Sequence, residues 1–477
     1  MFVSHLESAL DGTQLPANQL QTLHNGRPLW VRYNLNAVGR WLEKEKLRDR
    51  EPTMWRYREL LPLPNGVRPV SLGEGMTPLL ECSQLAEKFG LRDLWIKDES
   101  HLPTGSFKSR GLAMAITMAK HFRVKRVALP SAGNAGGAAA AYAARAGMEC
   151  FVFMPEDTPV INQYECQLAG AKTFLVNGLI NDCGKIVREG QQAMGWLDLS
   201  TLKEPYRIEG KKTMGLELAE QFDWKLPDVI LYPTGGGTGL IGMWKAFEEL
   251  RELGWLTGTK MPRMVAVQST GCAPIVTAFD KGERFAELFP NAATIASGIR
   301  VPAAVGDFMI LDAVRASGGL AISVEEERIR EWMELACRLE GIAVCPEAAA
   351  CVGALESLKA SRWIRPNDKV VIFNTGAAQK YVEAIRGELP KLDVSEPIDW
   401  ERLARGEAMI PRCSPGPCGL DDSTHESQPT HAGSGDSEAS VGMPTETPQA
   451  DELIAKASEE SLLIASPPVE APESSPE

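Results

Sequence analysis

The sequence contains no uninterrupted run of eighteen or more apolar residues, so no segment of it is typical of a membrane-spanning helix. Its first residues, MFVSHLESALDGTQ, contain neither a basic segment followed by an apolar block nor an arginine-rich, acid-poor stretch. The chain before residue 410 also lacks the excess of basic residues that nucleic-acid-binding surfaces carry. We therefore expect a cytoplasmic protein with neither a membrane nor a nucleic acid as partner.

Closely spaced cysteines are almost absent. Most of the ten cysteines lie singly inside apolar segments, such as Cys150 in MECFVF and Cys337 in MELACRLEG, as expected of reduced and buried thiols. The one close pair, Cys413 and Cys418, stands in the proline-rich stretch CSPGPC, which favours neither a disulfide nor a metal site.

The C-terminal segment 410–477 has no aromatic residue and few basic ones. It holds 13 aspartate and glutamate residues against Arg412 and Lys456, which gives it a net charge of −11 out of −13 for the whole chain. A segment rich in proline, serine and glutamate buries too little apolar surface to offset the entropy lost on ordering. We predict that this acidic tail is disordered.

From about residue 93 to 388 the chain alternates short β-branched runs with helical patterns. The strand-like runs include DLWIKDE, RVALP, CFVFMP, KTFLV, DVILY, RMVAVQST and KVVIF. This alternation predicts an α/β fold with parallel sheets and helices on both faces. In such sheets ligands bind at the carboxyl ends of strands, and three of these junctions carry small or polar residues: SAGNAGG (131–137), PTGGGTG (233–239) and NTGAA (374–378).

The glycine-rich junction directly follows the apolar strand DVILY and opens a helix. Glycines allow a ligand to approach the backbone, and the free amides of a helix start favour a phosphate there. A tight strand-to-helix turn explains the same residues equally well. The loop has neither the ending of a nucleotide P-loop nor the spacing of a dinucleotide fingerprint, which disfavours ATP and NAD. The candidate phosphate-binding residues are Gly235, Gly236, Gly237, Thr238 and Gly239.

Lys108 lies at the start of the helical stretch FKSRGLAMAITMAKHF, after the turn residues Pro103, Thr104 and Gly105. A cation at a helix amino terminus opposes the dipole, and the neighbouring Arg110 and partial burial would lower its pKa further. That place suits a lysine that forms a Schiff base. Taken alone, however, a lysine in a first helical turn is most often a solvated charge.

Two further junction residues have polar side chains. Asn134 in SAGNAGG can cap a helix or aim its amide into a cleft, and Thr375 in NTGAA is either a turn former or a cofactor partner. Neither residue is decisive by itself.

Six motifs in order resemble one family. They are SLGEGMTPLL (71–80), IKDESHLPTGSFKSRG (96–111), LPSAGNAGG (129–137), EGKKTMGLELAEQ (209–221), PTGGGTGLIGMWKAF (233–247) and NTGAAQKY (374–381). Together they resemble the threonine synthases, which belong to the tryptophan-synthase-β-like, fold type II pyridoxal-phosphate enzymes. The resemblance covers about residues 60 to 390.

The resemblance implies a role for each junction. Lys108 would form the Schiff base with pyridoxal 5′-phosphate and shuttle protons, and Phe107 would lie beside the cofactor. Asn134 would bind the 3′-oxygen of the ring and the 235–239 loop the phosphate. Thr375 would face the pyridine nitrogen, where a hydroxyl leaves the ring largely unprotonated and suited to elimination and replacement.

The resemblance also implies the reaction, in which O-phospho-L-homoserine and water give L-threonine and phosphate. A pyridoxal-phosphate-dependent threonine or serine dehydratase, a diaminopropionate ammonia-lyase or another β-replacement enzyme remains an alternative, and a non-catalytic cofactor-binding sensor is a third. The substrate phosphate needs cationic or hydroxyl partners. The candidates are Arg110, Ser131, Arg207, Lys211 and Lys212, although each basic residue could equally be a solvated or salt-bridged group.

The implied architecture is two doubly wound parallel-sheet domains with the cofactor in the cleft between them, in a protein that is usually a homodimer. We expect a large domain from 61–115 and 206–409, a smaller one from 116–205, and a degenerate ribbon-like extension over 1–60. That extension has Ser8, Asp11, His24 and Asn25 about where similar enzymes carry thiolates, so we expect no zinc site. Ser109 replaces a commoner aspartate or alanine after the lysine, so a contact near the cofactor rim could differ.

Overall fold

The structure of the protein is a computed structural model that describes residues 2–385, 392, 395 and 397–406. The chain divides into two units, Met1–Leu389 and Pro390–Glu477. In the second unit the described residues include the short helix α13 (Trp400–Ala404), which begins where the Asp399 side chain accepts hydrogen bonds from two backbone amides. The tail 410–477, predicted to be disordered, lies outside the described residues.

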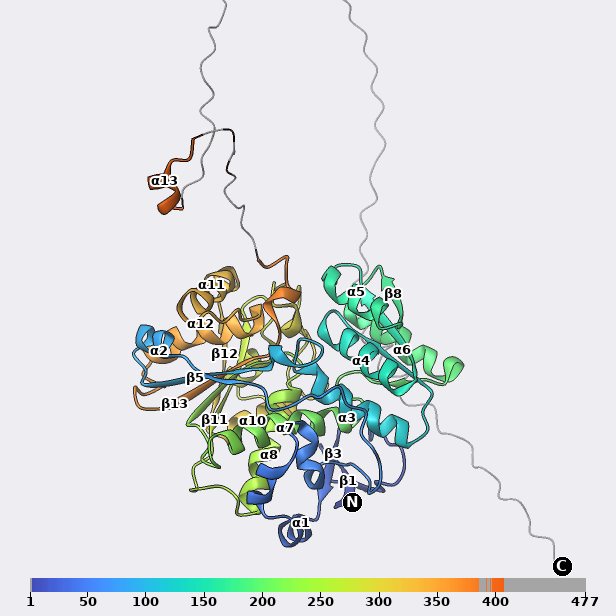
Figure 1. Ribbon diagram of the computed structural model, residues 1–477. Coiled ribbons are helices and arrows are strands. Elements are labelled where there is room, and N and C mark those ends of the chain that lie inside the picture. The colour runs from blue at the N-terminus through green and yellow to red at the C-terminus, as the bar shows by residue number, and fades with distance from the viewer. Residues whose placement is uncertain (1, 386–391, 393–394, 396, 407–477) are drawn as a thin grey trace, which may run out of the picture. The chain divides into compact units, whose positions relative to one another are not determined.

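A six-stranded sheet forms the centre of the first unit (Figure 1). Its strands run in the order β12, β11, β10, β13, β5, β4, and every neighbouring pair is parallel except β4 with β5. The bounds are Leu320–Val324 (β12), Arg263–Ser269 (β11), Val229–Pro233 (β10), Lys369–Asn374 (β13), Asp93–Asp98 (β5) and Leu79–Glu81 (β4). The runs VILYP and KVVIFN are buried almost throughout, as expected of strands covered on both faces.

Helices cover both faces of this sheet. One face packs against α2 (Ser83–Phe89), α11 (Ile329–Glu340) and α12 (Pro346–Ala360). The other packs against α7 (Tyr206–Gln221), α8 (Thr238–Glu252), α9 (Pro274–Asp280) and α10 (Asp307–Ala316). Most of α12, with the sequence PEAAACVGALESLKA, is buried, because small apolar residues occupy nearly its whole circumference.

A second, four-stranded sheet is parallel throughout, in the order β8, β7, β6, β9. Its strands are Lys172–Val176 (β8), Glu149–Pro155 (β7), Arg126–Pro130 (β6) and Leu197–Asp198 (β9). α4 (Asn134–Ala146) and α5 (Val160–Leu168) pack on one face and α6 (Ile180–Met194) on the other, and Figure 1 shows these helices gathered around this sheet. The fold is therefore the α/β class with parallel sheets that the alternation predicted.

The helix α3 (Lys108–His121) connects the two layered regions, because it packs against both α7 and α4. Eleven of its fourteen residues are buried, including all from Ser109 to Ala119. The first residue of α3 is Lys108, so the candidate cofactor lysine stands at the point where the two regions meet.

The N-terminal residues form a small antiparallel sheet of β1 (Val3–Ser8), β2 (Gln14–Leu15) and β3 (Leu29–Tyr33), followed by α1 (Leu35–Trp41). Tyr33 Oη donates a 2.6 Å hydrogen bond to Glu209 of α7, which ties this sheet to the large region. Asp11 accepts a 3.0 Å hydrogen bond from the backbone of Thr13, and His24 contacts the Asn25 amide. The 3₁₀ segments of the first unit are Lys44–Asp49 (η1), Met54–Leu60 (η2), Glu99–His101 (η3), Ser297–Ile299 (η4), Glu326–Arg328 (η5) and Ala378–Lys380 (η6).

Two details differ from the expectations or add to them. The strand β12 was not among the expected runs, because LAISV is short and follows two glycines. The described cysteines are buried except Cys337, which is exposed on α11, so the expectation for that residue was wrong. Among the described residues no helix is long and apolar enough to cross a membrane.

Candidate active site

The order of the central strands brings the predicted junctions together. β13 lies between β10 and β5 and is parallel to both, so the carboxyl ends of these three strands meet at one edge of the sheet. The chain leaves β5 toward Lys108, β10 toward the glycine loop and β13 toward Thr375. Asn134 reaches the same place from the smaller sheet, at the start of α4 after β6.

One cavity collects these residues. Every residue expected to bind the cofactor lines it: Phe107, Lys108, Asn134, Gly235, Gly236, Gly237, Thr238, Gly239 and Thr375. The remaining wall includes Thr201, Ser297, Gly298, Glu347 and Tyr381. The junctions that the sequence singled out one by one therefore form a single site in space.

The turn that carries Lys108 is fastened to the end of β13. Phe107 N donates to Thr375 O at 3.0 Å, and Ala377 N donates to Gly105 O at 2.9 Å. Gly105 has φ +61°, in the left-handed region that glycine adopts without strain. These bonds set the distance between Lys108 and Thr375 by backbone geometry, so it does not depend on the packing of flexible side chains.

Lys108 is half-buried on the cavity wall, without a counter-charge in contact among the described residues. Its Nζ lies 4.3 Å from the centre of the Phe107 ring, and within the described residues it makes no hydrogen bond or ion pair. Burial and, to a smaller extent, the positive charge of Arg207 lower the pKa of Lys108 to about 7, while the carboxyl group of Glu347 opposes the shift. The sequence had indicated a lowered pKa with Arg110 as the neighbour responsible; the structure identifies Arg207 instead.

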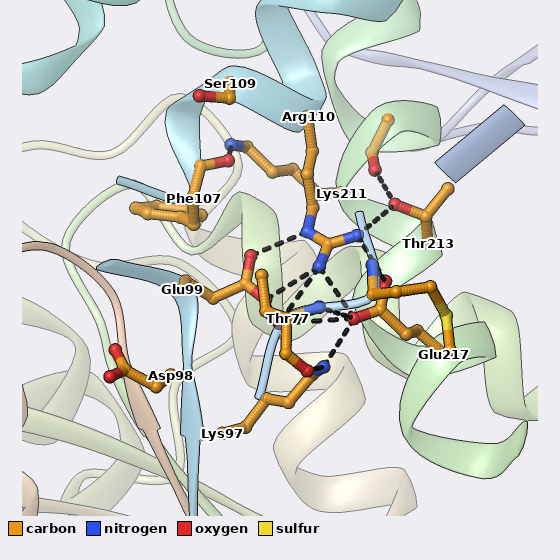
Figure 2. Close-up of polar contacts among 12 residues, drawn as sticks. Thr77, Lys97, Asp98, Glu99, Phe107, Ser109, Arg110, Lys211, Thr213 and Glu217 are labelled. Atoms are coloured by element: carbon orange, nitrogen blue, oxygen red, sulfur yellow. Dashed lines mark hydrogen bonds and ion pairs between the residues drawn. The ribbon is translucent and has the colours of Figure 1, made fainter. Parts of the chain in front are cut away.

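Lys211 holds the same turn from α7. Its Nζ donates to the carbonyl oxygen of Phe107 and lies 3.9 Å from the centre of the Phe107 ring (Figure 2). Burial, with the nearby charge of Lys108, lowers the pKa of Lys211 well below its ordinary value. Lys211 does not line the cavity, so its contact with the site is the hydrogen bond that holds the backbone of Phe107.

The glycine loop packs too tightly for side chains. A Cβ on Gly235 would lie 2.8 Å from Val301 Cγ2, and one on Gly236 would lie 2.9 Å from Thr201 Cγ2. Gly237 has φ +68° and precedes the first residue of α8, Thr238. Within the described residues no hydrogen bond occupies the amides of Gly235, Gly236 and Gly237. Free amides at the start of a fifteen-residue helix form a site for a phosphate.

Asn134 and Tyr381 form a polar pair on the cavity wall. Asn134 Nδ2 donates to Tyr381 Oη at 2.9 Å, while Asn134 Oδ1 is buried without a partner. Burial raises the pKa of Tyr381 well above its ordinary value, and the carboxyl group of Glu347 raises it further. Thr375 Oγ1 lies 3.6 Å from the Cys345 thiol, at the start of α12.

Arg110, a candidate for the substrate phosphate, is paired with two buried carboxylates. Its Nε donates to Glu99 at 2.6 Å and its Nη1 to Glu217 at 2.8 Å, and its side chain is fully buried. Figure 2 shows this network, which Lys97, Thr77 and Thr213 complete. Arg110 does not line the cavity, so the expectation that it contacts a phosphate is not carried forward.

The other phosphate candidates also lie outside the cavity wall. Lys212 stands between Glu209 at 2.7 Å and Glu249 at 2.8 Å, so it too is withdrawn. Ser131 Oγ accepts from Gly136 N at 2.9 Å and stabilises the turn before α4. Arg207 donates to Leu199 O at 2.5 Å, and within the described residues its Nε is buried without a partner.

Ser109 turns away from the site. Its Oγ lies 2.7 Å from Thr104 Oγ1 and also accepts from Thr104 N at 3.3 Å. The side chain is fully buried and does not line the cavity, so a direct contact at the cofactor rim is not what this residue provides.

Tyr381 and Glu347 are among the cavity residues that the sequence analysis did not single out. Tyr381 is the last residue of the quoted motif NTGAAQKY, but nothing marked its hydroxyl as part of the site. Glu347 is the one charged residue in the run VCPEAAACVGAL, and a carboxyl group at the start of an otherwise apolar helix is the signal that could have found it.

The groups on the cavity wall fit pyridoxal phosphate. The residues present are Lys108, an amine with a lowered pKa, a glycine loop with free amides at a helix start, and Asn134, whose buried amide oxygen has no partner within the described residues. These groups match an aldehyde, a phosphate and a polar aromatic ring.

Comparisons with known proteins agree with this chemistry. A family model described as pyridoxal-phosphate dependent enzyme matches residues 70–376. The chain is 34% identical over 367 residues to a threonine synthase of Methanocaldococcus jannaschii, covering 76% of this chain and 90% of that one. It is 37% identical over 336 residues to a threonine synthase of Methanosarcina acetivorans, covering 70% of this chain and 82% of the relative.

Solved structures show the same fold. Maize serine racemase matches with a TM-score of 0.56 at 22% identity, covering 69% of this chain and 92% of that one. Diaminopropionate ammonia lyase from Escherichia coli matches with a TM-score of 0.57 at 18% identity, covering 80% of this chain and 98% of that one. With the family match and the curated relatives, the chain belongs to the pyridoxal-phosphate-dependent enzymes of fold type II and, among them, to the threonine synthases.

Proposed function

We propose that this chain converts O-phospho-L-homoserine and water to L-threonine and phosphate, with pyridoxal 5′-phosphate as cofactor. The observation that carries the proposal is that Lys108, an amine unpaired within the described residues, and the glycine loop line the same cavity at the carboxyl ends of β5 and β10. The threonine synthase relatives support the choice of substrate within the family.

The cavity residues divide the work of holding the cofactor. Lys108 would bind its aldehyde carbon, and the amides of Gly235, Gly236, Gly237, Thr238 and Gly239 its phosphate. Asn134 would bind the ring oxygen and Thr375 the ring nitrogen, with Phe107 beside the ring. When bound, the cofactor supplies an electron sink for the negative charge that develops when a substrate proton leaves.

Lys108 would be the residue that moves protons from Cα and Cβ of the substrate. An amine with a pKa near 7 is suited to this role, because it accepts and returns protons near neutral pH. Arg207 does not line the cavity either, but its Nε has no partner within the described residues and its charge acts on Lys108, so we keep it as a candidate for the substrate phosphate.

The test is one incubation assayed for three products. Purified protein loaded with cofactor is mixed with O-phospho-L-homoserine or with L-threonine, and phosphate, threonine and 2-oxobutanoate are measured together. Equal amounts of phosphate and threonine from the first substrate support the proposal. Release of 2-oxobutanoate from threonine at a higher rate would assign the chain to the dehydratases, and turnover of neither substrate would leave only cofactor binding.

We further propose a cytoplasmic homodimer, on the resemblance alone, and the domain division 61–115 with 206–409, and 116–205. Light scattering on the purified protein tests the dimer. Limited proteolysis tests the division, because a boundary between compact domains is cut before their interiors.

A further inference from the structure

Glu347 is a carboxyl group in the wall of the active-site cavity to which no role has been given. It lies in the first turn of α12 and is 2% exposed. Among the described residues that line the cavity, Lys108 is the one with an amine side chain and Glu347 the one with a carboxyl group. The charge of Glu347 acts on Lys108, which places the two groups in the same electrostatic environment.

The two oxygens of Glu347 are not equivalent. Oε1 accepts a 2.7 Å hydrogen bond from Gly298 N in η4, which fixes the orientation of the carboxyl group. A Cβ on Gly298 would lie 2.6 Å from that oxygen, so the glycine permits the contact. Oε2 is buried and has no hydrogen-bond partner within the described residues. A buried oxygen without a partner is costly in a structural carboxyl group.

The surroundings favour the neutral form of this group. Burial raises the pKa of Glu347 above its ordinary value, and this effect outweighs those of the nearby Cys345 thiol, the Glu347 and Gly298 amides and the nearby Tyr381 hydroxyl, which all act in the opposite direction. The titratable groups that face it are Lys108 from α3, Tyr381 after η6 and Cys345 before α12. None of these groups makes an ion pair with Glu347 within the described residues, so the carboxyl group can hold a proton on Oε2.

We infer that Glu347 is a second catalytic acid–base residue of this site, which donates its Oε2 proton to Cγ of the substrate after phosphate has left. The inference rests on the proposed function. It assigns to Glu347 the hydration half of the reaction, while Lys108 serves the elimination half.

The protons balance under this division. Lys108 accepts the protons from Cα and Cβ, and the Cγ–O bond breaks with its electron pair going to phosphate. One of the two protons leaves with phosphate and the other returns to Cα. Glu347 gives its proton to Cγ, which becomes the methyl group, and then accepts one from the water whose hydroxyl bonds to Cβ. Glu347 therefore ends the cycle neutral, as it began.

The decisive variant is Glu347→Gln, which keeps an oxygen for the Gly298 amide but cannot donate an acidic proton. In rapid-mixing experiments with the cofactor-loaded enzyme, E347Q should release about one phosphate per site in the first turnover. Threonine formation should fall on the order of 10²-fold, the usual contribution of one general acid or base. Phosphate and threonine that fall by the same factor, or an unchanged rate of threonine formation, would overturn the assignment.

A matched control lies on the same helix. Glu356→Gln changes a carboxyl group of α12 that pairs with Arg328 outside the cavity, so phosphate and threonine should stay equal and near the wild-type rate. Glu347→Asp keeps an acidic proton, so its two products should also stay equal, at a lower rate. Unequal products from E347D count against the inference, even if E347Q does not retain the cofactor.

Infrared spectroscopy gives a readout that does not depend on turnover. The carbonyl stretch of a protonated carboxyl group should be present in the wild type and in E356Q but missing from E347Q. An identical band in all three proteins would show that Glu347 is ionised and would refute the inference. A wild-type enzyme that makes neither phosphate nor threonine would instead refute the proposed reaction itself, before any variant is compared.

Discussion

Lys108 and Arg110 are two residues apart in the first turn of α3, and Arg110 is fully buried while Lys108 is half-buried on the cavity wall, yet the pKa values of the two side chains are shifted in opposite directions. Arg110 is bonded to the carboxylates of Glu99 and Glu217, and its pKa rises above its ordinary value because these charges outweigh the cost of burial. Lys108 has no such partner and its pKa falls to about 7. The first turn of α3 therefore carries one cation that is paired with two carboxylates, Arg110, and one amine that makes no ion pair within the described residues, Lys108.

The comparison teaches how this site separates positioning from chemistry. A buried cation with two carboxylate partners is fixed in place and gives up its ability to change protonation state. A buried cation without partners stays able to lose its proton and to react. Arg110 anchors the start of α3, and Lys108 extends from that anchor into the cavity.

Lys108→Ala should have the largest effect on activity. Phosphate release from O-phospho-L-homoserine should fall on the order of 10³-fold or more, because the proton-transfer group is lost. Borohydride should no longer fix the cofactor to the chain, as measured by mass spectrometry. The melting temperature of the cofactor-free protein should not fall, since the removed amine had no partner within the described residues. A large drop would show that the Lys108 amine makes a stabilising contact.

Arg110→Met should have the largest effect on stability. It leaves Glu99 and Glu217 buried without their cation, so the free energy of unfolding should fall by about 3–5 kcal/mol. Urea denaturation of the cofactor-free protein measures this. A loss of less than about 1 kcal/mol in the free energy of unfolding would show that Arg110 is not paired with both carboxylates in solution.

The rate at which cofactor-free protein captures pyridoxal phosphate should depend on pH through Lys108. Only the unprotonated amine attacks the aldehyde, and the pKa of Lys108 is lowered to about 7. The rate should be nearly constant above this pH and fall roughly tenfold for each unit below it. Absorbance of the bound cofactor follows the reaction, and a midpoint near that of an ordinary lysine would show that Lys108 is solvated.

Lys211→Met should separate support from reactivity. It removes the hydrogen bond to the Phe107 carbonyl, so unfolding should become easier by about 1–3 kcal/mol. The charges that act on the pKa of Lys108 are those of Arg207 and Glu347, not that of Lys211. The pH midpoint of cofactor capture should therefore stay near that of the wild type, and a shift of more than about one unit would assign Lys211 an electrostatic role.

Arg284→Met is the smallest expected effect and the reference for Arg110→Met. Arg284 pairs with Asp312 at 2.8 Å, and both side chains are nearly half exposed. The free energy of unfolding should change by about 0–1 kcal/mol, since solvent screens an exposed pair. Urea denaturation under the same conditions measures both variants. Similar losses in the free energy of unfolding for Arg284→Met and Arg110→Met would show that the buried pairing of Arg110 contributes no more than an exposed pair.

Local patterns were sufficient to single out residues that the structure brings together in one cavity. Lys108, Asn134, the glycine loop and Thr375 each stand where an apolar strand gives way to a helix or turn, and parallel sheets bring such points to one edge. The cationic candidates could not be sorted in this way. The partners of Arg110 and Lys212 are chosen by packing: Glu217 lies 107 positions from Arg110 in the sequence, and Glu249 faces Lys212 from another helix.

The sequence by itself determined the α/β class, the strand ends that carry chemistry and the lysine that stands among them, because periodicity and turn residues act over short distances. The tertiary structure decided which charged side chains are paired with an opposite charge and which are left unpaired. It paired Arg110 with two carboxylates, left Lys108 unpaired, and placed Glu347 in the cavity wall with one free oxygen. Burial and partner geometry set the protonation state of a side chain, and both depend on residues distant in sequence.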